Sequence, residues 1–100
     1  MNQVERITYY ENLLNESKAV LSEYDRALEA YISVQKKLTE LEKYYVSPEW
    51  KEDFEASEKD ELPKDLRCGV LSEDGIDHVL GDNLDLFAET RSIAERVAKK

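Results

Sequence analysis

The sequence contains few of the residues on which many folds depend: among 100 residues there are one cysteine, two prolines and three glycines. Cys68 has no second cysteine with which to form an internal disulfide, as is typical of a reducing compartment. So little Pro and Gly leaves few tight turns for an all-β fold. No apolar run approaches the roughly 18 residues that a membrane span needs. With no charged-then-apolar leader at the start, these absences predict a cytoplasmic protein without disulfides, β-sheets or membrane spans.

Positive charge is also scarce: the chain has 14 basic and 23 acidic residues, and its net charge is -9. Nucleic acid and anionic membranes repel such a protein, so we expect neither as a direct partner. Residues 46–75 hold 4 basic and 10 acidic side chains, a net -6. A basic partner, a cation or solubility alone would explain this concentration. With 41% hydrophobic residues the chain has enough apolar material for one folded domain, residues 1–100.

The longest regular pattern runs from Gln3 to Tyr45, without Pro or Gly. Its apolar residues recur in steps of three and four, which place them on one face of an α-helix. They are Val4, Ile7, Tyr10, Leu13, Leu14, Val20, Leu21, Tyr24, Ala27, Leu28, Tyr31, Val34, Leu38, Leu41 and Tyr45. All except Val4 lie in three of the seven heptad rows, a stripe wide enough to contact two helices. We therefore predict bundle packing rather than a two-stranded zipper.

The remaining chain predicts two shorter helices, about 48–59 and about 73–98, joined by an ordered loop. Ser47 and Ser72 are good N-caps for these helices, and Gly69 permits a left-handed turn in the loop. Gly81 is a point where the last helix could break. The fold class is thus all-α, with the third helix packed antiparallel to the first. Because the first helix is about 65 Å long and the third about 39 Å, we expect a homodimer to cover the rest of the stripe.

Trp50 and Phe54 share one side of the second predicted helix. Two interpretations are open for these rings. They could close the end of the bundle near Tyr44 and Tyr45, or they could form an aromatic patch that binds a partner. The first interpretation is the more ordinary one.

A signature of mixed aromatic, acidic, Pro and Gly residues spans the two connections between helices. It reads Tyr44-Tyr45-x-Ser47-x-x-Trp50-x-x-Asp53-x-Glu55 and then Leu62-Pro63-x-Asp65-Leu66-x-x-Gly69-Val70-Leu71-Ser72-Glu73-Asp74. This signature resembles a small bacterial family of domains of unknown function, number four-two-nine-eight, whose members have about this length and a predicted helix on either side. The resemblance implies a helical fold over nearly the whole chain, and it supplies no catalytic residue.

Caps, turns and core filling explain most of the signature, but several acidic positions are left over. Together with the rings of Trp50 and Phe54, these acidic residues are our predicted partner-binding residues. The full set is Trp50, Asp53, Phe54, Glu55, Asp65 and Glu73.

A metal site is the main chemical alternative. Asp74, His78 and Asp82 recur every four residues, on one side of the third helix, and could ligate a metal if the second helix supplied further oxygens. A solvated helix face is the simpler interpretation of the same spacing. No phosphate loop, nucleophile elbow or carboxylate pair is recognisable, and Cys68 has no base near it in sequence.

The function that these observations favour is a non-enzymatic interaction or scaffolding module that binds another protein and needs no cofactor. The alternative is a metal-binding protein or metal-dependent enzyme that uses acidic residues and His78. A third option is an acidic mimic of nucleic acid.

Overall fold

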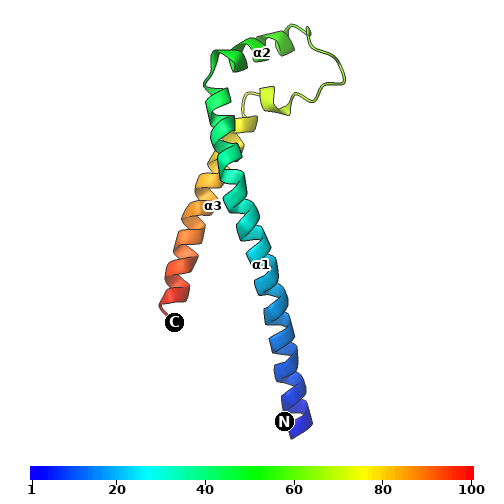
Figure 1. Cartoon of the computed structure of the whole chain (residues 1–100), viewed down its shortest axis with the longest axis vertical. Helices are drawn as coiled ribbons and strands as arrows, with labels where there is room; N and C mark the ends of the chain where they lie inside the picture. Colours follow the sequence, from blue (N-terminus) through cyan, green and yellow to red (C-terminus); the bar gives the residue numbers. More distant parts are fainter. The chain divides into compact units, whose positions relative to one another are not determined.

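A computed structural model describes all of residues 1–100, and it is all-α. Its elements are α1 (Gln3–Tyr45), α2 (Pro48–Glu58), the short 3-10 helix η1 (Gly69–Leu71) and α3 (Gly75–Ala98) (Figure 1). No strand is present. The predicted fold class is therefore confirmed, with a long first helix, a short second helix, an ordered connection and a C-terminal helix.

The predicted boundaries are correct for α1 and one residue too long for α2, but α3 begins later than predicted. Ser72 is not its N-cap, because the Ser72 hydroxyl donates to Gly69 O at 2.8 Å and closes η1 instead. Asp74 occupies the N-cap position without a side-chain capping bond. Gly81 does not interrupt α3, which is continuous through it.

The chain divides into two compact units, Met1–Lys36 and Lys37–Lys100. The first unit is a helical segment, and none of its side chains is buried. Its N-terminal cap was not predicted from the sequence. Asn2 Oδ1 accepts from the Glu5 backbone N–H at 2.8 Å, and Asn2 Nδ2 donates back to the Glu5 carboxylate at 2.9 Å. This reciprocal pair satisfies a backbone donor that a helix start leaves without an intrahelical partner.

The second unit has a small core around η1. Leu71 and Ile76 are its buried apolar side chains, with 7% and 3% of their surface exposed. Contacts between elements join α2 to η1 and η1 to α3, and the Tyr45 hydroxyl near the end of α1 lies 3.4 Å from Glu73 O. The helices of this unit thus meet at one junction, which is built from the loop and the helix ends.

The end of α2 contains the chain's one non-glycine residue of positive φ, Asp60, at 57°. The Asp60 N–H donates to Ser57 O at 3.1 Å, and the Glu61 N–H donates to Ala56 O at 2.9 Å. This is the Schellman arrangement, in which the left-handed residue is usually Gly. The prediction that Gly69 supplies a left-handed turn is wrong, because no glycine has positive φ.

Gly75 is required for a steric reason instead. A Cβ at this position would lie 2.5 Å from Ser72 Oγ and 2.6 Å from Gly69 O. Gly69 O is held in place, since it accepts hydrogen bonds from both the backbone and the side chain of Ser72. The first turn of α3 can therefore approach η1 only because Gly75 has no side chain.

Two glycines of α3 form a matched pair of tests. Gly75→Ala should lower the free energy of unfolding by about 1–3 kcal/mol, because the new methyl overpacks the η1 junction. Gly81→Ala should raise it by about 0.5–1 kcal/mol, because helix propensity improves and nothing lies within 4 Å of the added Cβ. Urea unfolding followed by circular dichroism at one fixed protein concentration measures both. Equal effects of the two substitutions would contradict the close approach at Gly75.

Asp60→Gly should stabilise the protein by up to about 1 kcal/mol, because Gly removes the steric cost of the left-handed conformation. Asp60→Ala removes the same charge but keeps a Cβ, so it should not stabilise. The same urea titration compares them. If the alanine variant gained as much as the glycine variant, charge rather than backbone strain would be the cause.

Candidate functional site

The corner between α1 and α2 is formed by Ser47. Its backbone N–H donates to Tyr44 O at 3.0 Å, and its hydroxyl donates to the same carbonyl at 2.6 Å. The hydroxyl also accepts from the Trp50 N–H at 3.3 Å, as the predicted N-cap of α2. Pro48 follows at the first helical position and disfavours helical backbone at the residue before it. One serine thus ends α1 and starts α2.

A hydrogen bond between Tyr44 and Asp53 spans this corner. The Tyr44 hydroxyl donates to Asp53 Oδ2 at 2.5 Å, and both side chains are half-buried. The bond to the carboxylate raises the pKa of Tyr44 from 10.0 to about 12, with smaller contributions from desolvation and from the negative charges of Asp53 and Glu49. Tyr44 is therefore a neutral donor throughout the ordinary pH range. A charge-assisted bond of this kind is stronger than one between neutral groups.

Trp50 connects α2 to η1 on the other side of the corner. Its indole Nε1 donates to Val70 O at 2.9 Å. Its ring stacks on Phe54 and meets Tyr45 edge-on, with centroids 5.1 Å apart in each pair. Such ring pairs add about 0.5–1.5 kcal/mol beyond their buried area. The predicted packing of the rings near Tyr44 and Tyr45 is confirmed for Trp50 against Tyr45, and a role of the rings in binding a partner stays a prediction.

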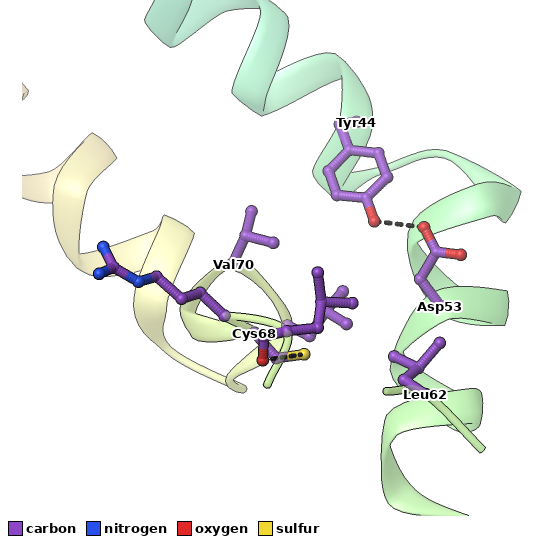
Figure 2. Close-up of a pocket in the computed structure, with 8 residues that line it drawn as sticks. Tyr44, Asp53, Leu62, Cys68 and Val70 are labelled. Atoms are coloured by element: carbon purple, nitrogen blue, oxygen red, sulfur yellow. Dashed lines mark hydrogen bonds between the residues drawn. The ribbon is translucent and has the colours of Figure 1, made fainter. Parts of the chain in front are cut away.

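A hollow of about 320 Å³ lies beside the Tyr44–Asp53 bond. Figure 2 shows Tyr44 and Asp53 joined on one side of it, with Cys68 and Val70 on the other side, at the start of η1 and within it. Its lining residues are Tyr44, Asp53, Leu62, Leu66, Arg67, Cys68, Val70 and Leu71. The hollow is mostly apolar, and four of its lining residues are leucine or valine.

The chemistry that this lining offers is limited. The Asp53 carboxylate already accepts the Tyr44 hydroxyl, and the Cys68 thiol donates to Leu66 O at 3.5 Å. A nucleophilic cysteine needs a base within hydrogen-bond reach, and a backbone carbonyl cannot take its proton. The lining contains no histidine and no second carboxylate that could form an acid–base pair with Asp53. The geometry therefore supports a structural junction better than a catalytic one.

Three of the other predicted partner-binding residues lie outside the lining of this hollow. Glu55, Asp65 and Glu73 are exposed. Glu73 contributes its backbone carbonyl as the acceptor for Tyr45. Tyr44 and Val70 both lie inside the signature but are not among the predicted partner-binding residues. Nothing in a sequence pattern shows that a tyrosine hydroxyl or a backbone carbonyl will meet a side chain on a later element.

The predicted metal ligands lie on the exposed side of α3. His78 Nε2 and Asp74 Oδ2 are 3.8 Å apart, and the two side chains are 72% and 69% exposed. Asp82 is exposed one helical turn further on. No group of three or more His, Cys, Asp or Glu side chains is placed to hold a metal ion. The helical spacing was read correctly, but no second element adds ligands to it.

The fold and the junction define a small all-α chain whose aromatic–acidic signature links its three helices. Residues 7–93 match the family model described as Domain of unknown function (DUF4298), and the chain belongs to that family. The predicted family is thereby confirmed. Searches of curated proteins and of solved structures gave no match. None of the helices combines the length and the apolar character that crossing a membrane requires.

The Tyr44–Asp53 bond predicts a specific pH dependence. The pKa of Tyr44 is about 12 in the folded protein, and its ordinary value, which applies to the unfolded chain, is 10.0. The contribution of the bond to folding stability is therefore complete below pH 10 and is lost as the pH rises through about 12. Tyr44→Phe should remove this loss of folding stability at alkaline pH. It should also lower the free energy of unfolding at neutral pH by about 1.5–3 kcal/mol. Near-ultraviolet absorbance should also lose the tyrosine ionisation near pH 12.

The matched control is Tyr9→Phe, since Tyr9 is exposed on α1. This change should alter stability by less than about 0.5 kcal/mol. If the two phenylalanine variants had the same stability and the same titration, the bond between Tyr44 and Asp53 would not exist in solution.

Proposed function

We propose that the chain is a non-enzymatic protein–protein interaction module whose binding surface is the apolar face of α1 in the unit Met1–Lys36. This face, called the α1 stripe below, has nine large apolar side chains. They are Ile7, Tyr10, Leu13, Leu14, Val20, Leu21, Tyr24, Leu28 and Val34. The observation that carries the proposal is their exposure, which ranges from 37% to 67%.

The energetic argument concerns the helix as well as its side chains. Isolated helices are marginal in water, and most helical stability in proteins comes from packing one apolar face. Burying one Val, Leu, Ile or Phe side chain contributes roughly 1.5–3 kcal/mol. A helix that leaves seven such side chains and two tyrosine rings 37–67% exposed does not gain the remainder of this stabilisation. Contiguous apolar patches of this size on monomers mark interaction sites.

The kind of partner follows from the width of the α1 stripe. Its residues occupy three heptad rows, and such a face packs against one or two further helices. The unit that contains the stripe is also less acidic than the rest. Residues 1–36 contain 4 basic and 6 acidic side chains, a net -2 of the chain's -9. The stripe therefore suits an amphipathic helical partner, and the acidic remainder of the chain favours solubility.

This places the interface away from the partner-binding residues that the sequence first indicated. Trp50 and Asp53 are engaged by Val70 O and Tyr44 inside the unit Lys37–Lys100. Removing either side chain would disturb the junction whether or not a partner is present. The metal-binding alternative, the nucleic-acid mimic and the cytoplasmic location stay predictions.

The test compares two lysine substitutions at neighbouring positions. Leu21 is in the α1 stripe and Ser22 points to another face of the helix. In native lysate, the wild-type chain should migrate in an assembly larger than its own 11.6 kDa. Leu21→Lys should weaken that assembly by about 10–100-fold, because the burial of one leucine is lost. Ser22→Lys adds the same charge and should leave it unchanged.

Two results would contradict the proposal. The wild-type chain could migrate at its own mass at every concentration, or both lysine variants could behave alike.

A further inference from the structure

We propose that the α1 stripe is covered by a second copy of this chain, whose α1 runs antiparallel so that Ser17 of one copy faces Gln35 of the other. This inference rests on the proposed function and names its partner. It comes from the pattern of polar interruptions in the stripe, a hollow beside one of them, and the area that the stripe offers.

Two rows of the stripe form the seam in question. The first holds Ile7, Leu14, Leu21, Leu28 and Gln35, and the second holds Tyr10, Ser17, Tyr24 and Tyr31. Between residues 7 and 36 each row is apolar except at one position, Gln35 in the first row and Ser17 in the second. In an antiparallel helix pair, residues of the first row face residues of the second. A polar residue in such a seam fixes the register, because burying it against an apolar side chain is costly.

One register satisfies both polar positions together. When Ser17 faces Gln35 of the second copy, Leu21 faces Tyr31 and Tyr24 faces Leu28 in the intervening layers. A shift by one heptad in either direction separates the polar pair. It places Ser17 against Leu28 or Glu42 and Gln35 against Tyr10 or Tyr24. Within residues 7–36 this is therefore the one antiparallel alignment that pairs the two polar positions. Beyond that range the same alignment places Tyr10 against Glu42.

The surface at Ser17 has space for the longer side chain. A hollow of about 360 Å³ is lined by Glu16, Ser17, Val20 and Leu21. It lies where the small serine interrupts the row of larger side chains. Gln35 is half-buried, and its Nε2 donates to Tyr31 O at 3.2 Å, which holds the amide at the helix surface. A glutamine can fill such a hollow and exchange hydrogen bonds with the serine hydroxyl.

The area of the stripe is sufficient for a stable dimer. At about 25 cal/mol per Å², the burial energy of one such side chain corresponds to roughly 60–120 Å². Nine side chains then offer roughly 500–1,100 Å² per copy, whereas a standard interface uses about 800 Å² per partner. Charge repulsion between two copies is also reduced at the stripe, because the unit Met1–Lys36 carries only -2 of the chain's net charge of -9.

The experiment uses the full-length chain with Cys68→Ser, so that no native thiol interferes, and with Ser17→Cys and Gln35→Cys added. Positions 17 and 35 are about 27 Å apart along one helix, and a disulfide requires Cα atoms within about 7 Å. A link between them must therefore join two copies. Mild oxidation should give a covalent dimer whose peptide map contains the 17–35 link.

The control pair replaces Ser17→Cys by Ser22→Cys, which moves the thiol off the stripe. Its cross-linking should be lower by on the order of 1,000-fold, as expected when a millimolar effective concentration is replaced by collision at micromolar concentration. Light scattering of the wild-type chain should give a molar mass of twice 11.6 kDa. This measurement needs no substituted variant.

Other outcomes would each overturn this inference in a distinct way. Links of 17 to 17 and 35 to 35 would show a parallel dimer. A purified chain of 11.6 kDa at every concentration, with cross-linking no higher than the control, would exclude a second copy as partner. A large assembly in native lysate would then still support the proposed function, with a different helical protein on the stripe.

Discussion

The central physical constraint on this chain is the burial of the apolar side of α1. Along Met1–Lys36 no side chain is buried, although large apolar groups recur with helical period over that whole length. Burial of apolar area is the dominant favourable term in folding and in most association. In the proposed interaction, α1 gains this burial from the partner that covers the stripe. The interaction proposed for this chain follows from this one requirement.

The family signature has a different role, because its residues hold the second unit together. Ser47 forms the corner, Tyr44 and Asp53 close it, and Trp50 fixes η1 through Val70 O. Each contact joins residues from different elements by a hydrogen bond that positions the backbone. The signature therefore needs no catalytic chemistry to explain it. It produces a folded head that ends α1 and begins α3.

Much of this architecture could be predicted from the sequence, and the reasons are local. The 3.6-residue period defined α1, and Ser47-Pro48 defined the corner, because helix faces and caps depend on neighbours in the chain. The errors occurred where a group interacts across the loop. Ser72 closes η1 instead of capping α3, and Gly75 is needed because Gly69 O lies close to it.

The candidate site shows the same division between local and non-local information. The spacing of Asp74 and His78 correctly placed their side chains together on one helix face. A metal site needs ligands from a second element, and spacing within one helix cannot supply them. The Tyr44–Asp53 bond was not predicted, because it joins side chains from two different helices. It depends on the direction in which α2 leaves the corner, which the residue types alone do not specify.

Hydrogen–deuterium exchange of the α1 amides between residues 10 and 35 tests the central claim most directly, because backbone protection reports whether the helix is packed. The account predicts slow exchange at high protein concentration that becomes faster on dilution, as the covering chain dissociates. Exchange at the rate of an unstructured peptide at every concentration, both in the purified protein and in native lysate, would contradict it.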